Sequence, residues 1–368
     1  MTALAALAAR DAGTPTKIVT NDHLLIFGLA VSEAQQNEFR EFVERMALSI
    51  HPFASVSNLS DPQVDDLWKL HVEKGEVRQA FEFLTGLPEI DEVYVVRDWQ
   101  LCNRLALSLY PQSLHICYGD SVGVYFPRPG NKLNDILQRT RRNFLDKMGF
   151  ATTADSAFRI DISYLLLPEA FATPPSKSII PTNRSDFIRI YQKAIPLISN
   201  EWLRDIKRKV MGEHIWIFMG SNFSEQGLMT VEQEIAAYRE WILSLVPVPA
   251  TIKLLIKSHP RDSNSKYELL ADAMRTSFAE VISLNDAAGS YAPVEMVLLE
   301  LRNIAKSIEC LAVSTACLGC GLVLGLPTRV GFGKQLVSKY FPRRYRASRV
   351  RHEARLNELC FSLTRSNR

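Results

Sequence analysis

The stretch LLIKSHPRDS, residues 254–263, decides the fold class, because a run of aliphatic residues typical of a buried strand ends abruptly in a polar, turn-forming cluster. A histidine that precedes proline is restricted to extended backbone conformations, so we expect His259 at the rim of a sheet. The alternative is a plain strand-to-loop turn with a solvated histidine. The choice between the two depends on the rest of the chain.

Further strands and helices alternate on both sides of this stretch. The predicted elements are the strand HIWIFMG (214–220), the helix TVEQEIAAYREWILSLV (230–246), the strand TIKLLIKS (251–258), the helix KYELLADAMRTSF (266–278), the strand EVISL (280–284), the helix APVEMVLLELRNIA (292–305) and the strand ECLAVS (309–314). This alternation predicts α/β units of Rossmann character with a parallel sheet.

An earlier series has the same character. It consists of KIVTN (17–21), a helix over 32–50, the strand EVYVV (92–96), a helix over 98–110 and the strand LHICYG (114–119). Its first residues look helical, whereas a Rossmann domain normally opens with a buried strand, so either that strand is missing or the domain is organised differently. The segment FATPPSKSIIPTNRS (171–185) is rich in Pro and Ser and predicts an interdomain connection or a surface loop.

Composition narrows the class of protein. A chain of 368 residues exceeds the usual size of one core, which favours two domains. The net charge of +3 and the lack of aromatics interleaved with basic residues argue against a nucleic-acid partner. We interpret the six scattered cysteines as reduced thiols, which implies the cytoplasm, and Cys317 and Cys320 as part of a small-residue helix or turn rather than a zinc site. The chain has no convincing signal peptide or spanning stretch, so we expect a soluble or peripheral protein.

Basic residues concentrate near the C-terminus, in RRYRASRVRHEARLNE (343–358). Six arginines there face only two acids, a density that suits an anionic polymer or a phospholipid surface; they are Arg343, Arg344, Arg346, Arg349, Arg351 and Arg355. The alternative is a solvated helix face.

Ligands of an open parallel sheet bind beyond the carboxyl ends of its strands, so the residues after each predicted strand are candidate site residues. Four strand ends carry such residues: Asp120 between Gly119 and Gly123; Gly220 and Ser221 at the start of GSNFSEQG; Lys257, His259 and Arg261; and Ser314 with Thr315. Hydroxyls, a histidine, cations and backbone N–H groups together can hold a phosphate and a carboxylate without metal. There is no D-x-D pair near a strand end and no H-E-x-x-H, so the sequence does not demand a divalent metal.

Each of these groups also has a structural use. Asp120 could form a turn, and Ser314 with Thr315 could cap a helix. Glu295 lies just inside a predicted helix start, where a carboxylate interacts well with the helix dipole whether or not it binds a ligand. Their shared position at strand ends favours a common site.

These motifs resemble those of bacterial sialyltransferases, most closely the α-2,8-polysialyltransferase-like family. YGDSVGVYF, GSNFSEQG, LLIKSHPRD, APVEMVLLE and AVSTACLG follow the family's order and approximate spacing over roughly residues 90–335. The resemblance implies a GT-B-like fold, with two Rossmann-like domains facing a central cleft, a CMP-activated sialic acid donor, inversion at the anomeric carbon and no metal or other cofactor. The same architecture serves sugar-nucleotide epimerases and some binding proteins.

Carried over to this sequence, the resemblance implies a role for each motif. The acidic motif falls on Gly119, Asp120 and Ser121, keeps only its middle acid, and makes Asp120 the general base. His259 and Pro260 match the His-Pro motif, and His259 would hydrogen-bond or protonate the departing CMP phosphate. Ser314 and Thr315 would bind that phosphate or the donor carboxylate, and Glu295 would contact the nucleotide. The other expected donor-binding residues are Gly220, Ser221, Lys257, Pro260 and Arg261.

We therefore predict three parts: an acceptor-side domain (1–190), a nucleotide-sugar-binding domain (191–335) and a basic helical tail (336–368). The expected partners are a CMP-sugar, a glycan acceptor and, through the tail, a polyanionic product or the inner membrane, with the protein cytoplasmic or peripheral. Two alternatives stay open: a CMP-Kdo-type transferase, and a non-catalytic sugar-nucleotide or glycan-binding protein, which the altered acidic motif favours.

Overall fold

The computed structural model describes residues 1–13, 21–27, 36–73, 76–87, 89–96, 101–119, 160–168, 175–245, 251–259, 264–285 and 291–366. The chain divides into two compact units. Unit 1 contains Met1–Leu29 and His51–Asp186, and unit 2 contains Ala30–Ile50 and Phe187–Arg368. Every strand pair in the described residues is parallel, and each unit combines its sheet with helices, which confirms the predicted α/β class.

Unit 2 is built on a five-stranded parallel sheet in the order β11-β10-β7-β8-β9. The strands are β7 (His214–Met219), β8 (Lys253–Lys257), β9 (Glu280–Ser283), β10 (Ser307–Ala312) and β11 (Thr328–Val330). Counted along the chain as strands one to five, this is the order 3-2-1-4-5 of a Rossmann sheet, in which the direction of winding reverses between the first and fourth strands. The reversal lies here between β7 and β10, and open sheets of this kind bind ligands beyond the carboxyl ends of the strands at such a point.

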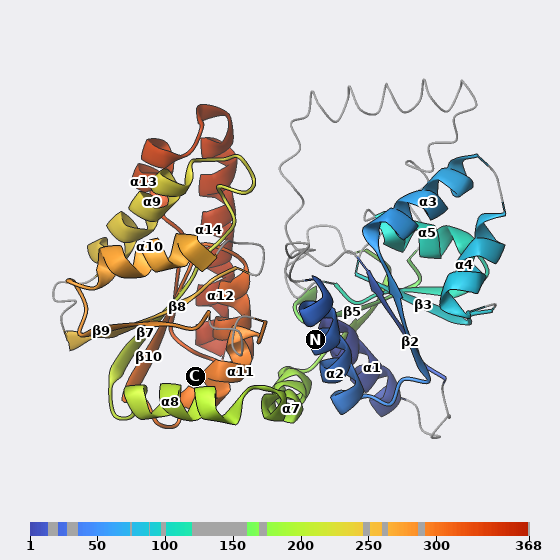
Figure 1. The fold of residues 1–368 in the computed structure, drawn as a ribbon, viewed down its shortest axis with the longest axis horizontal. Helices are drawn as coiled ribbons and strands as arrows, with labels where there is room; N and C mark the ends of the chain where they lie inside the picture. Colours follow the sequence, from blue (N-terminus) through green and yellow to red (C-terminus); the bar gives the residue numbers. More distant parts are fainter. Residues whose placement is uncertain are drawn as a thin grey trace. The chain divides into compact units, whose positions relative to one another are not determined.

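Helices cover both faces of this sheet (Figure 1). One face carries α9 (Val231–Ser244), α10 (Asn264–Met274) and α13 (Gly333–Tyr340), and the other carries α8 (Asn200–Val210) and α11 (Val294–Leu301). The remaining helical segments are α2 (Gln36–Ile50), α7 (Arg184–Ala194), η4 (Ile195–Leu197), α12 (Ala316–Leu318), η6 (Gly319–Val323) and α14 (Arg343–Ser366). The middle residues of the central strands β7 and β8 are apolar and buried because helices cover both faces.

The core of unit 2 on the α9 side is aromatic. Phe218 of β7 packs edge-on against Tyr238 and Trp241 of α9, with ring centroids 4.8 Å and 6.3 Å apart. The predicted helix over 230–246 is present as α9, and Thr230 caps its start through a capping box with Gln233. These contacts hold α9 against β7 and the loop between them.

Unit 1 has a four-stranded parallel sheet in the order β3-β4-β5-β6 and a separate parallel pair β1-β2. Its strands are β1 (His23–Phe27), β2 (Ser55–Leu59), β3 (Glu92–Val95), β4 (Leu114–Cys117), β5 (Ile162–Leu165) and β6 (Ser178–Pro181), and its helices are α1 (Thr2–Gly13), α3 (Asp61–Val72), α4 (Val77–Thr85) and α5 (Leu101–Leu109). Arg10 of α1 binds both carboxylate oxygens of Asp22, and His51 contacts the same carboxylate at 2.7 Å. Asp22 therefore ties α1 to the start of β1 and to His51, which precedes β2.

One prediction for the N-terminal half is untested and another was wrong in detail. The chain does begin with a helix, and the first strand in the described residues is His23–Phe27. The predicted strand KIVTN (17–21) lies outside the described residues except for Asn21. The segment 171–185 is not simply a connection, because it contains β6 and the first residues of α7. Its isoleucines, Ile179 and Ile180, give it enough β-propensity to pair with β5 despite the flanking prolines.

No helix in the described part of the chain is long and apolar enough to cross a membrane.

The predicted domain boundary at residue 190 falls within α7, whereas the division of the chain into two compact units falls between Asp186 and Phe187. The segment Ala30–Ile50 belongs to unit 2, where Tyr291 packs against Phe39 and donates a hydrogen bond to Glu38 at 3.1 Å.

Candidate functional site

The central three strands of unit 2 bring the candidate residues to one edge. Met219, the last residue of β7, pairs with Lys257 on β8 and with Ala312 on β10. The residues that follow each strand therefore emerge side by side at the carboxyl edge, as the sequence predicted. These residues include Gly220 and Ser221 after β7, His259 after β8, and Ser314 and Thr315 after β10. The β7 and β10 groups flank the reversal in strand order, where Rossmann sheets bind their ligands.

The end of β8 combines a buried cation with a more accessible imidazole. Lys257 is buried, with 6% of its surface exposed, whereas His259 is partly exposed. The residue between them, Ser258, donates its backbone N–H to Oδ1 of Asn285 at 2.7 Å. Asn285 follows β9 and so holds the β8 end in place from the neighbouring strand end. Pro260 and Arg261, which the sequence also predicted for this site, lie outside the described residues.

Asn285 has a second feature that the sequence did not reveal. Its side chain is 8% exposed, and within the described residues its Nδ2 has no hydrogen-bond partner. A buried amide without a partner costs free energy of about 1–3 kcal/mol. Such a group at a strand-end site is a candidate donor to a ligand.

Glu295 lies in the first turn of α11, where the helix dipole favours its negative charge. Its Oε1 lies directly over Gly319, since a Cβ built on Gly319 would be 2.2 Å from that oxygen. Burial raises the pKa of Glu295 above its ordinary value, and its own backbone N–H and the charge of Lys257 oppose part of that rise. Glu295 is thus close to the segment that follows Ser314 and Thr315, and it interacts electrostatically with the end of β8.

Ser314 and Thr315 are both partly exposed at the start of α12. Ser314 Oγ accepts a long 3.5 Å hydrogen bond from the N–H of Ala316, whereas Thr315 occupies the N-cap position without a side-chain capping bond. The Ser314 hydroxyl therefore caps the helix only through a long hydrogen bond, and the Thr315 hydroxyl does not cap it. The small residues that follow, including buried Cys317 and Cys320, form the expected short helix and turn.

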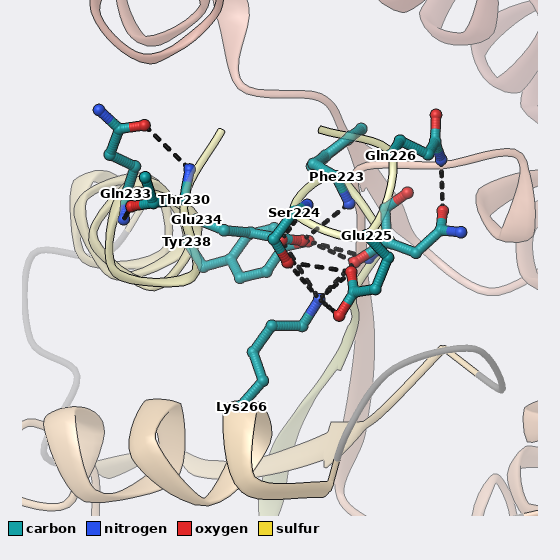
Figure 2. Close-up of polar contacts among 11 residues, drawn as sticks. Phe223, Ser224, Glu225, Gln226, Thr230, Gln233, Glu234, Tyr238 and Lys266 are labelled. Carbon is teal, nitrogen blue, oxygen red and sulfur yellow. Dashed lines mark hydrogen bonds and ion pairs between the residues drawn. The ribbon is translucent and has the colours of Figure 1, made fainter. Parts of the chain in front are cut away.

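The loop GSNFSEQG is held by a buried charge network that the sequence analysis missed (Figure 2). Glu234 of α9 is 0% exposed and accepts hydrogen bonds from the backbone N–H groups of Phe223 at 3.3 Å and Ser224 at 2.8 Å. Lys266 of α10 is 1% exposed and reaches Glu234 at 3.2 Å, Glu225 at 3.0 Å and the carbonyl of Ser221 at 3.2 Å. Side chains of α9 and α10 thus hold the GSNFSEQG loop in place.

Tyr238 completes this network. Its hydroxyl hydrogen-bonds to Glu234, accepts the N–H of Ser221 at 2.9 Å and lies 3.0 Å from the Ser221 carbonyl. Burial raises the pKa of Tyr238 well above its ordinary value, so the phenol is neutral. Every hydrogen bond made by the Ser221 backbone here stays within the loop and its two helices.

This arrangement leaves fewer backbone N–H groups of the loop available for the predicted phosphate contact. Those of Ser221, Phe223 and Ser224 already bind protein acceptors, and that of Gly220 bonds to the Lys257 carbonyl at 3.4 Å. The requirement for glycine at 220 is steric, because a Cβ there would lie 1.9 Å from the Tyr267 hydroxyl. A role for Gly220 and Ser221 in donor binding stays a prediction.

The general base predicted from the first half, Asp120, lies outside the described residues. Gly119, just before it, has a left-handed φ of 64°, which glycine adopts without strain. This agrees with the expected turn after β4.

The basic C-terminal segment forms α14, but three of its arginines are engaged with protein acceptors. Arg346 donates to the Phe341 carbonyl at 2.8 Å, and Arg349, whose side chain is 12% exposed, pairs with Glu353 at 2.7 Å. Arg355 pairs with Glu358 at 2.7 Å on the same helix. The prediction that six arginines form one solvated or ligand-binding face is therefore wrong for Arg346 and Arg349. Arg343, Arg344 and Arg351 are exposed.

A family model described as Alpha-2,8-polysialyltransferase (POLYST) matches residues 159–305. This match covers less than half of the chain, includes Gly220, Lys257, His259 and Glu295, and ends before Ser314. It confirms the predicted resemblance to this family.

Among solved structures, an S. aureus MnaA–UDP co-structure matches with a TM-score of 0.45 and 13% identity, covering 84% of this chain and 79% of that chain. A crystal structure of UDP-GlcNAc 2-epimerase from Neisseria meningitidis bound to UDP-GlcNAc matches with a TM-score of 0.44 and 11% identity, covering 86% and 85%. Similarities this low do not bear on function. No curated protein matches the chain.

Proposed function

We propose that this protein transfers sialic acid, or a related nonulosonate, from a CMP-sugar to a hydroxyl of a glycan acceptor, with inversion and without a metal. The observation that carries the proposal is that Lys257, His259 and Ser314 lie at the carboxyl ends of β8 and β10, the two neighbours of β7 in a Rossmann-ordered sheet. A cation, an imidazole and hydroxyls at one edge suit a phosphate that leaves with negative charge.

The reaction assigns a task to each group. The bond between the anomeric carbon and the CMP phosphate oxygen breaks, and its electron pair stays on the phosphate. The acceptor oxygen forms the new glycosidic bond and gives its proton to a general base, for which Asp120 is the candidate. His259 hydrogen-bonds or protonates the leaving phosphate, and the Ser314 and Thr315 hydroxyls bind the phosphate or the donor carboxylate. Because charge on the phosphate grows as the bond breaks, these donors stabilise the transition state more than the ground state.

Glu295 and Asn285 would contact the nucleotide in this proposal. Glu295 is placed near Lys257 and over Gly319, and a carboxylate there can accept hydrogen bonds from ribose hydroxyls or a cytosine amino group. The Nδ2 of Asn285 is a buried donor at the adjacent strand end. It could satisfy an acceptor on the nucleotide.

The test is release of CMP from CMP-sialic acid, followed by chromatography with and without a glycan acceptor. Wild-type protein should release CMP, and His259→Ala should release it at least about tenfold more slowly, as loss of leaving-group stabilisation predicts. His214→Ala is the matched control, because His214 is exposed at the opposite end of β7, where its ring contacts Ser307. No CMP release by the wild type, or equal rates for both variants, would contradict the proposal.

We also propose that the two exposed arginines at the start of α14 bind an anionic surface. Arg343 and Arg344 head the helix and are exposed, unlike Arg349. Replacement of both by Ala should weaken binding to polysialic acid or to vesicles containing anionic lipid, measured separately at low salt. Loss of only one interaction identifies the anion; unchanged binding to both rejects the proposal.

A further inference from the structure

Arg349 of α14 contacts both segments that flank the reversal point of the sheet. Its guanidinium donates a hydrogen bond to the carbonyl of Val313, the residue immediately before Ser314. The same group lies over the ring of Phe223, 4.9 Å from the centroid, and Phe223 belongs to the GSNFSEQG loop after β7. One side chain from the C-terminal helix therefore touches the loop that follows β7 and the turn that follows β10.

The guanidinium is itself held from behind. Glu353, which is 3% exposed, accepts its Nε–H at 2.7 Å and also accepts the backbone N–H of Gly333 at 2.8 Å. Gly331, with a φ of 80°, lies so close that a Cβ there would be 2.6 Å from the Glu353 carboxyl carbon. The turn after β11 thus fixes Glu353, and Glu353 fixes the plane of the guanidinium.

Aromatic rings surround the remaining face of this group. Phe341 and Phe332 lie with centroids 5.6 Å and 5.9 Å from the guanidinium carbon, and both rings also pack against Phe223. A planar guanidinium can stack on aromatic faces while its N–H groups bond in the plane of the group, a geometry that a tetrahedral ammonium does not have. The setting is therefore specific for arginine rather than for positive charge.

We propose that Arg349 is a positioning residue of the donor site: it fixes the Ser314–Thr315 turn and the GSNFSEQG loop relative to each other. The statement that these segments bind the donor rests on the proposed function. The statement that Arg349 holds the two segments together rests only on the contacts described above. It predicts that loss of Arg349 disturbs nucleotide binding although Arg349 is not itself a ligand-binding group.

The experiment compares wild type, Arg349→Ala, Arg349→Lys and the control Arg351→Ala, which removes an exposed arginine of the same helix. CMP affinity is measured by calorimetry after circular dichroism has verified folding. We expect an affinity loss of about tenfold or more in both Arg349 variants and none in the control, since a displaced loop or turn weakens every contact it makes. Added guanidinium chloride at low millimolar concentration should restore part of the affinity of Arg349→Ala and leave the control unchanged. A merely structural defect would not respond in this way.

Amide hydrogen exchange separates failure of this inference from failure of the proposed function. Residues 220–228 and 312–318 should both exchange faster in Arg349→Lys than in wild type or Arg351→Ala. If wild type binds no CMP, the proposed function fails and the exchange data alone decide the positioning role. If Arg349→Ala does not fold, Arg349→Lys carries the test. Wild-type affinity in that variant, or unchanged exchange in both segments, overturns the inference.

Discussion

The carboxylate of Glu295 lies against Gly319, so closely that a Cβ on Gly319 would fall 2.2 Å from Oε1. The nearest atom is the end of a flexible side chain, so Gly319→Ala should move the carboxylate and leave the backbone in place. Alanine would otherwise favour the helical turn by up to about 1 kcal/mol. We expect normal or raised thermal stability with CMP binding about tenfold weaker, measured by calorimetry. Gly321→Ala is the control, since its Cβ would be an ordinary 3.4 Å from Thr328 Oγ1. Equal affinity of both variants would show that Glu295 does not contact the nucleotide.

Removal of the Lys266 charge should strongly destabilise unit 2. Lys266→Met leaves Glu234 buried with its negative charge unpaired, which typically costs about 3–5 kcal/mol. The double variant Lys266→Met/Glu234→Gln removes both charges and should recover part of this loss, since glutamine can still accept a backbone N–H of the loop. Urea unfolding monitored by tryptophan fluorescence gives the coupling between the two sites. Additive effects of the two substitutions would argue against the charge network.

Acid should destabilise the protein through His352. Burial, aided by the charge of Arg349, lowers the pKa of His352 to about 4. The unfolded histidine, with its ordinary pKa near 6.5, binds more protons than the folded one between these values, so stability falls as the pH falls from about 6.5 to 4. The imidazole is partly exposed, so we expect its contribution to be on the order of 1–2 kcal/mol. His352→Gln should reduce the change in the free energy of unfolding between pH 6.5 and pH 4. An unchanged slope in urea titrations at pH 7, 6, 5 and 4 would exclude His352 as its source.

A substitution at Asn285 can separate the structural role of its Oδ1, which accepts the Ser258 N–H, from the proposed binding of the nucleotide by its Nδ2. Asn285→Asp keeps an oxygen to accept the Ser258 N–H but loses the Nδ2 donor. If that donor binds the nucleotide, the variant should fold normally and bind cytidine several-fold more weakly, measured by calorimetry. Uncharged cytidine avoids repulsion between the new carboxylate and a phosphate. Weakening of CMP binding alone would indicate repulsion, and wild-type affinity for both ligands would remove Asn285 from the nucleotide site.

Much of unit 2 could be predicted because its strands are continuous apolar runs between polar helix starts. HIWIFM and KLLIK are buried along nearly their whole length, so their ends, and hence the positions of Gly220 and His259, followed from the pattern. The short strand β11 and the polar strand β2 carry no such signal, because TRV and SVSNL are set by pairing with neighbours.

The supporting contacts could not be predicted for a different reason. Glu234 looks like a surface residue in the first turn of an amphipathic helix, yet it is completely buried because Lys266, on the next helix, neutralises it. Arg349 likewise looked like one charge among six, although it bonds to Val313, far away in the sequence. Pairs of this kind depend on tertiary packing, and no local pattern marks them.

The most direct test of the proposed donor site is calorimetric titration of the whole protein with CMP, CDP, UDP and GDP, repeated on His259→Ala. The account predicts that CMP binds preferentially and that the variant binds it more weakly, since the imidazole contacts the phosphate. Preference for UDP or GDP, or no nucleotide binding, would contradict it.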